Sequence, residues 1–200
     1  MTAYCTANDV KARIVGNPVY MPTLFDAVIG NIIDAVSAEL DREIAKGRGI
    51  SAPWSFIADS IASARLYTGK PGNVRLLPID DCIVVTSAVI AGATLVLGTD
   101  YQVFPLNGAV ITALIRINGT WSQTYAGISV SAKWGCATTA PRDLWNAAVV
   151  ESVRGYLAAR EGENDTIGMT PFGSMVTSKA FTSKTWQLIQ TYGHGAGYLR

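Results

Sequence analysis

The chain has 200 residues, of which 49% are hydrophobic and 16% charged, and its formal net charge is +1. This length suits one elaborated domain or two small ones, with enough apolar residues for a core. A net charge near zero gives no indication of whole-protein attraction to nucleic acid or to an anionic membrane. Because an average soluble domain has roughly 25% charged residues, the composition favours a surface covered by other subunits. A polar surface rich in Ser, Thr and Asn would have the same composition.

Membrane insertion and secretion find no support in the sequence. No apolar run approaches the ~20 residues that cross a bilayer. The first residues lack a basic segment followed by an apolar one, so we expect no signal peptide. The three cysteines, Cys5, Cys82 and Cys136, are scattered and show no CxxC spacing. We therefore expect free thiols in a reducing compartment.

Two helices are predicted before residue 50. Thr6 and Asp9 have the spacing of a capping box, and Gly16-Asn17-Pro18 ends that first helix. Pro22-Thr23 opens a longer helix over residues 24–46, with Asp26 again three residues after the Thr. Its apolar stripe consists of Leu24 or Phe25, Val28, Ile29, Ile32, Ile33, Val36, Leu40 and Ile44, whereas Asp26, Gly30, Asp34, Ser37 and Asp41 share the opposite face.

Residues 57–134 are rich in Val, Ile, Thr and Tyr, and turn signals are frequent. We predict strands near residues 62–67, 74–79, 82–90, 94–97, 100–104, 110–117 and 128–134. Asp80-Asp81 is interpreted as a tight turn, residues 94–104 as a hairpin, and Asn107-Gly108 as a second hairpin turn. This many short strands predicts a small antiparallel sandwich or barrel.

A central helix is predicted over residues 141–161, because Pro141 suits a first turn and Arg160 with Gly162 marks an end. Its core face carries Trp145, Ala148, Val149, Ser152, Val153, Tyr156 and Leu157. A short last helix follows within residues 178–192. The predicted fold is therefore α+β: a bundle of three to four helices from residues 1–50 and 135–200, including a C-terminal arm, with an inserted antiparallel β-sandwich or barrel-like domain at 57–134.

We find no arrangement of residues that supports catalysis, a cofactor or a metal. The one histidine, His194, lies in a glycine-rich tail, and only a pairing with Cys136 would offer a nucleophile and base. Basic residues do not cluster around the aromatic residues of the strand region, so base stacking has little support. We therefore expect no enzyme.

Four segments together resemble the head-to-tail connector (adaptor) proteins of long-tailed bacteriophages. They are the helical pair TANDVKARI and TLFDAVIGNIIDAVSAELDRE; ARLYTG with LLPIDDCIVVTSAVIAGATLVLGTDY; VFPLNGAVITALIRI with Trp121; and ISVSAKWG with Pro141 and the Ala-rich helix. The order and spacing of these segments carry the resemblance, because none is a catalytic signature.

The resemblance implies a structural virion protein at the head–tail interface, assembled in the host cytoplasm. Such proteins form a homo-oligomeric ring, usually of twelve subunits, on the portal protein. The ring extends the channel for double-stranded DNA, without sequence-specific binding, and gives a stopper or tail-completion protein a docking face. The alternative is a β-sandwich module of the virion that binds a receptor or a carbohydrate.

Two sets of residues are candidates for these roles. Asp26, Asp34 and Asp41 could line a channel, where carboxylates would keep DNA from adhering; the alternative is a merely solvated face. Trp186, His194, Tyr198, Leu199 and Arg200 could anchor the C-terminal arm on the portal or on a neighbouring subunit, because Tyr and Arg are enriched at interfaces. The alternative is a tail without function.

Overall fold

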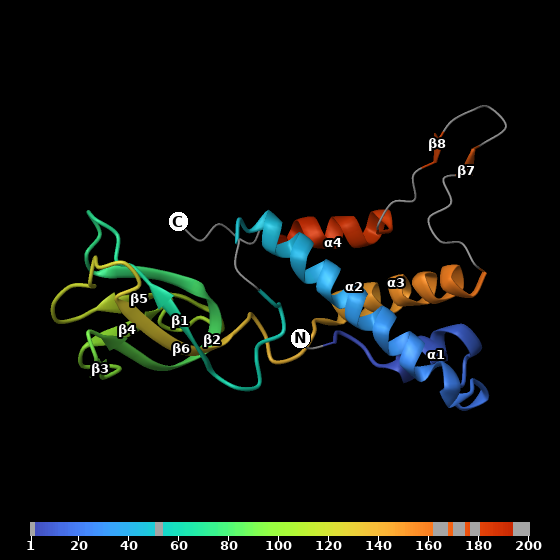
Figure 1. Cartoon of the computed structure of the whole chain (residues 1–200), viewed down its shortest axis with the longest axis horizontal. Coiled ribbons are helices and arrows are strands. Elements are labelled where there is room, and N and C mark those ends of the chain that lie inside the picture. The colour runs from blue at the N-terminus through green and yellow to red at the C-terminus, as the bar shows by residue number, and fades with distance from the viewer. Residues whose placement is uncertain (1–2, 51–53, 162–167, 170–174, 177–180, 194–200) are drawn as a thin grey trace. The chain divides into compact units, whose positions relative to one another are not determined.

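A computed structural model describes residues 3–50, 54–161, 168–169, 175–176 and 181–193 of the chain. Its residues divide into two compact units, a helical unit within residues 3–49 and 140–193 and a β unit within residues 50–139 (Figure 1). The predicted α+β class is confirmed, since helices and an antiparallel sheet of six strands are both present. No helix among the described residues is long and apolar enough to cross a membrane.

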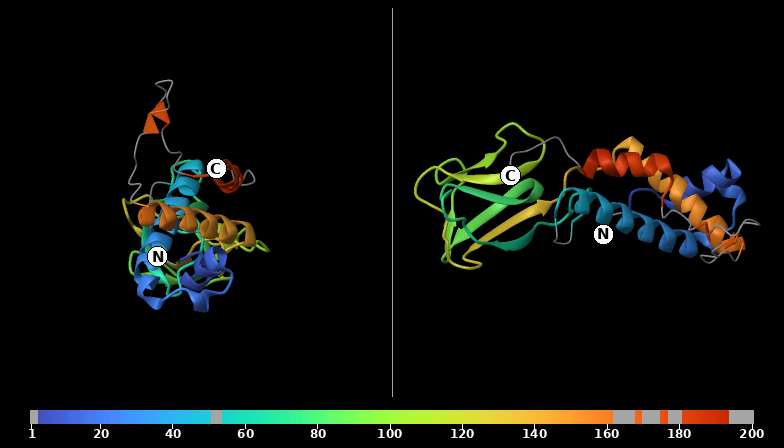
Figure 2. Two further views of the ribbon diagram at one scale, coloured as in Figure 1. Left: turned by 90° about the vertical axis from the view of Figure 1, so that its right-hand side faces the viewer. Right: turned by 90° about the horizontal axis from the view of Figure 1, so that it is seen from above.

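The helical unit consists of α1 (Ala7–Val15), α2 (Asp26–Gly47), α3 (Arg142–Glu161) and α4 (Ser183–Gly193). Two 3-10 turns, η1 (Pro18–Tyr20) and η2 (Thr23–Phe25), lie between α1 and α2, and β7 (Gly168–Met169) pairs with β8 (Met175–Val176). Helix α2 packs against α3 and α4, while α1 packs against α3. Figure 2 shows α2 crossing α3 and running beside α4.

The starts of the first two helices differ in how they are capped. The predicted capping box of α1 is confirmed: the Thr6 side chain accepts from the backbone N–H of Asp9, whose carboxylate accepts from that of Thr6. The same spacing at Thr23 and Asp26 forms no such box. Thr23 instead lies in η2, and α2 begins at Asp26 without a side-chain cap. The prediction of a second box was wrong, and the Asp26 carboxylate pairs with Lys11 instead.

The buried face of α2 is rotated from the predicted one. Ile29, Ile33, Leu40 and Ile44 are buried as predicted, but Leu24 and Val28 are 80% and 46% exposed. Ser37 and Asp41 are buried in their place, at 0% and 1% exposure. A prediction of the buried face from hydrophobicity alone could not include Ser37 and Asp41, because their burial depends on hydrogen-bonding partners elsewhere in the chain.

The β unit is one antiparallel sheet. Its strands are β1 (Ser63–Tyr67), β2 (Leu76–Ile90), β3 (Ala93–Leu95), β4 (Tyr101–Phe104), β5 (Ile111–Arg116) and β6 (Ile128–Trp134). Their order is β1-β6-β2-β5-β4, with β3 beside β2. The core comprises twelve buried residues: Leu77, Ile79, Cys82, Ala88, Tyr101, Ile111, Leu114, Trp121, Ile128, Val130, Ala132 and Trp134. The long β2 contributes to it along its whole length.

Strand β2 passes without a turn through Asp80-Asp81, so the predicted turn there was wrong. Leu76–Pro78 and Cys82 pair with β5, whereas the residues from Cys82 to Ile90 pair with β6. The register with β5 shifts between Pro78 and Cys82. Asp80 accepts hydrogen bonds from Arg65 (2.8 Å) and from the hydroxyl of Tyr67 (2.9 Å). These bonds from β1 satisfy a carboxylate that otherwise favours a turn.

The two predicted hairpins had different outcomes. Strands β4 and β5 pair antiparallel across Asn107-Gly108, as predicted, with Tyr101 opposite Arg116. Strand β3 pairs with β2, with Ala93 opposite Ile90, instead of forming a ladder with β4. Residues 98–100, at the centre of the first predicted hairpin, therefore connect two strands that have different partners.

Candidate assembly site

The three carboxylates predicted to line a channel all lie on α2 but in different surroundings. Asp34 is exposed. The side chain of Asp26 is 42% exposed and forms an ion pair with Lys11 of α1. Asp41 is only 1% exposed. Asp34 is thus the member of this set that can face a water-filled channel without rearrangement of the subunit, whereas Asp41 is part of the interior.

The N-terminal segment covers the polar stripe at Ser37 and Asp41. The backbone N–H of Tyr4 donates to the hydroxyl of Ser37 at 3.2 Å. The Tyr4 hydroxyl donates to the Asp41 carboxylate at 2.5 Å, and Tyr4 itself is 3% exposed. Hydropathy alone predicts that this stripe is solvent-exposed. In the structure it instead binds the segment at Tyr4, more than thirty residues earlier in the chain.

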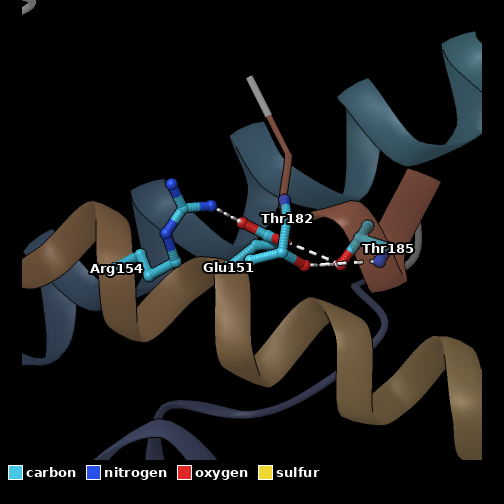
Figure 3. A network of polar contacts seen from close by, with 4 residues as sticks. All are labelled: Glu151, Arg154, Thr182 and Thr185. Atoms are coloured by element: carbon cyan, nitrogen blue, oxygen red, sulfur yellow. Dashed lines mark hydrogen bonds and ion pairs between the residues drawn. The ribbon is translucent and has the colours of Figure 1, made fainter. Parts of the chain in front are cut away.

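Glu151 of α3 anchors the start of α4 (Figure 3). It is 4% exposed, and its Oε1 accepts the backbone N–H of Thr182 at 2.8 Å and the hydroxyl of Thr185 at 2.6 Å. Arg154, one turn along α3, donates to the other oxygen. A buried carboxylate at the N-terminus of α4 satisfies a backbone donor that the helix leaves free, and the helix dipole favours the negative charge there.

The ionisation of Glu151 reflects this arrangement. Burial alone would raise the pKa of this carboxyl group. Hydrogen bonds from Thr185 and Thr182, together with the one from Arg154, outweigh burial and hold the pKa below its ordinary value. Glu151 is therefore charged at neutral pH.

The other end of α4 is fixed by three contacts. The hydroxyl of Tyr192 donates to both oxygens of Asp143 at 2.9 Å, near the start of α3. Arg48 Nε donates to the carbonyl oxygen of Tyr192 at 2.9 Å. Gly47 and Gly193 lie so close that a Cβ on Gly47 would stand 2.8 Å from the Gly193 Cα. Helix α4 is thus held at both ends.

The predicted anchor residues of the arm divide between the described and undescribed parts of the chain. Trp186 lies on α4 in a half-buried position, where its ring packs edge-on against Phe181 at 5.9 Å between centroids. Trp186 therefore contributes to the packing of this unit. His194, Tyr198, Leu199 and Arg200 lie outside the described residues.

Sequence reasoning did not single out Glu151. One signal was present: Glu151 interrupts a face of small and apolar residues that includes Ala148 and Ser152. A lone acid on a buried helix face requires a hydrogen-bonding partner. The sequence does not show that this partner is the start of α4, which lies thirty-one residues later.

The thiols show no sign of activation. Burial raises the pKa of Cys82 to about 12, and burial with the nearby Asp9 raises that of Cys5 to about 11. Both are therefore protonated at neutral pH and weak as nucleophiles. The Cys136 thiol donates to Asp81 at 3.4 Å within the β unit. Among the described residues, no group of three or more His, Cys, Asp or Glu side chains could hold a metal ion.

The fold has counterparts among solved structures. A chain from the neck of an empty GTA (gene transfer agent) particle, computed with C6 symmetry, matches 95% of this chain and 89% of its own length, with a TM-score of 0.59 and 16% identity. A chain from the neck of a native GTA particle, computed with C12 symmetry, matches 86% of this chain and 87% of its own, with a TM-score of 0.51 and 16% identity. No family model and no curated protein matches the chain. The likeness therefore establishes the fold.

Proposed function

We propose that this protein is a structural component of the head–tail neck of a phage-like particle. The observation that carries the proposal is that 95% of the chain, with both its helical and its β unit, has a counterpart in one chain of a GTA neck. The sequence resemblance to head-to-tail connectors points to the same location independently. The protonated thiols of Cys5 and Cys82 and the tightly anchored α4 are in keeping with a structural role.

Within that neck, we infer that the protein is the adaptor that assembles as a ring of twelve copies on the portal. The low charge content and the symmetry of the similar necks support this inference. The ring would extend the channel for double-stranded DNA and offer a docking face to a stopper or tail-completion protein. Asp34, the exposed carboxylate of α2, is the candidate for the channel wall; Asp26 could join it only by leaving Lys11.

The attachment point of the arm supports a role in docking. Residues 194–200 follow directly on Gly193, which is held against Gly47 at the end of α2. An arm that leaves from a fixed point reaches a defined region of a partner surface, which lowers the entropic cost of binding. We propose that Tyr198, Leu199 and Arg200 bind the portal or a neighbouring subunit, and that Trp186 supports the arm from within α4.

Negative-stain microscopy combined with native mass measurement tests the proposal. The full chain, alone and mixed with portal-bearing heads, should give closed rings whose mass is twelve times the 21.3 kDa subunit. Rings should also appear at the portal vertex of the heads. A protein that remains monomeric in both samples contradicts the adaptor assignment. Binding of that monomer to host-cell glycans would favour the alternative, a β module that recognises a receptor or carbohydrate.

A further inference from the structure

The exposed large hydrophobic side chains of the helical unit are confined to one short segment. Among the described residues of that unit, every such side chain that is at least 36% exposed lies between Val15 and Val28. The set is Val15, Val19, Tyr20, Leu24, Phe25 and Val28. Val19, Tyr20 and Leu24 are the most exposed, at 84%, 77% and 80%. We call residues 15–28 the apolar corner; Figure 1 shows it where α1 leads into α2.

A buried lysine holds the apolar corner in place. Lys11 of α1 is 2% exposed, and its Nζ forms an ion pair with Asp26 and lies 3.4 Å from the carbonyl oxygen of Met21. Burial of a lysine is costly unless its charge is paired and hydrogen-bonded. Lys11 therefore ties the middle and the end of the corner to α1, and Met21, at 8% exposure, is turned inward.

Short-range hydrogen bonds and one aromatic contact support the conformation of the apolar corner. The Asn17 side chain accepts from the backbone N–H of Val19 at 3.1 Å, and its carbonyl accepts from that of Tyr20 at 3.1 Å. Phe25 packs edge-on against Tyr156 of α3, with 6.2 Å between ring centroids. These contacts position the backbone at Val19, Tyr20 and Phe25, while the side chains of Val19, Tyr20 and Leu24 stay exposed. A preformed apolar projection loses little conformational entropy when a partner covers it.

The composition of the apolar corner limits what its partner can be. Residues 16–25, GNPVYMPTLF, contain no charged side chain. Nucleic acid is thereby disfavoured as a partner, because the electrostatic attraction to phosphates comes from Lys and Arg. A charged protein surface is also disfavoured as a partner, because the corner has no charges to pair with it. An apolar patch of this kind on a chain poor in charge fits a subunit interface, since charged residues are depleted where interfaces are fully buried.

We propose that the apolar corner is the contact by which one copy of this chain packs on the next. This inference rests on the proposed ring. Contacts between successive copies in a ring are heterologous, so the corner would pack on a different surface of the neighbour. The proposal names a second copy as the occupant, which agrees with the symmetric necks that contain similar chains.

The test is a pair of acid substitutions, Val19→Asp and Leu24→Asp, made together in the full chain. Both side chains are strongly exposed, so the subunit should keep its circular-dichroism spectrum and its Tm. The matched control is Val96→Asp with Leu106→Asp, which adds the same charge at residues of the β unit that are 57% and 64% exposed. We expect loss of the ring in the corner variant, which should run at subunit mass, and rings in the control as in the unmodified protein.

The outcomes distinguish failure of the proposed ring from failure of the proposed contact at the apolar corner. An unmodified protein that never forms rings overturns the proposed function and, with it, this inference. Rings that persist in the corner variant overturn only the inference. Equal loss in both variants also contradicts it, because the effect would then come from added charge anywhere.

A photo-crosslinker at Tyr20 identifies the occupant directly. When ¹⁴N-labelled and ¹⁵N-labelled copies are mixed before assembly, a corner that contacts a second copy should give mixed-isotope crosslinks on mass spectrometry. Crosslinks within a single isotope only would show that the chain covers its own corner, which would overturn the proposal.

Discussion

The hydroxyl of Tyr4 donates a 2.5 Å hydrogen bond to the carboxylate of Asp41, and both residues are almost completely buried. This bond explains why an acid on the polar face of α2 lies in the interior. An unpaired buried carboxylate would be costly, so Tyr4 and Asp41 stabilise each other's position. The N-terminal segment is thereby part of the helical unit rather than a free extension.

Replacement of Tyr4 by Phe should therefore destabilise the protein. The ring is retained, but Asp41 loses a donor in a buried site, which typically costs about 1–3 kcal/mol. Urea unfolding followed by fluorescence or circular dichroism would measure the change. Tyr125→Phe is the matched control, because Tyr125 is 91% exposed and should tolerate the same change. Equal stability of the two variants would show that the Tyr4 hydroxyl contributes nothing.

Replacement of Glu151 by Gln should weaken the attachment of α4 in a pH-dependent way. Burial raises the pKa of Glu151, but the hydrogen bonds lower it by more, so its folded pKa lies below the ordinary 4.5. The stabilisation is therefore present above the unfolded pKa and is lost as pH falls through the folded pKa.

The measurement for Glu151 is the free energy of unfolding of both proteins between about pH 7 and pH 3. The variant should be less stable near neutral pH, and the difference should shrink in acid as the carboxyl group of the unmodified protein becomes protonated. Amide exchange in α4 should be faster in the variant at neutral pH. A difference that stays constant with pH would mean that the charge of Glu151 is irrelevant.

Tyr192 should affect folding stability at alkaline pH, whereas Glu151 affects it in acid. Burial, followed by its hydrogen bond to Asp143, raises its pKa from 10.0 to about 12. Because the folded pKa is raised, stability is intact below the unfolded pKa and falls as pH rises toward the folded one. Tyr192→Phe should reduce the slope of stability against pH above about 10. Alkaline denaturation curves identical in slope for both proteins would contradict this.

Gly47 should tolerate no side chain. A Cβ at this position would lie 2.8 Å from the Gly193 Cα, and backbone on both sides cannot move without separating α2 from α4. Gly47→Ala should therefore cost about 1–3 kcal/mol. Gly30→Ala on the same helix is the control: no atom lies within 4 Å of its added Cβ, and alanine should stabilise the helix by roughly 0.5–1 kcal/mol. Thermal unfolding of the two variants should shift in opposite directions.

Removal of residues 194–200 tests the docking arm. The contacts described for α4 involve residues up to Gly193, so we expect the truncated protein to keep the Tm of the full chain. If the arm anchors the ring, the truncated protein should fail to bind portal-bearing heads and should leave DNA-filled heads without tails. Attachment at full affinity would place the docking surface on the helices instead.

Local chemistry determined much of this fold. The Thr6–Asp9 capping box acts over a few residues and formed as predicted, and the strands on either side of Asn107-Gly108 pair as predicted. The strand at residues 128–134 was predicted at its observed bounds, and its residues alternate between buried and half-buried positions. Signals of this kind are complete within one element, so they can be interpreted without knowing what packs against it.

The tertiary structure decided what depends on partners distant in sequence. Asp80-Asp81 has turn composition, yet Arg65 and Tyr67 hold it within β2. Asp41 belongs to a polar stripe, yet Tyr4 buries it, so the stripe is no continuous channel lining. Leu24 looks like a core residue, yet it projects from a corner that Lys11 holds in place. In each case the outcome depends on a contact with a group outside the segment itself, and hydropathy along that segment does not reveal such a contact.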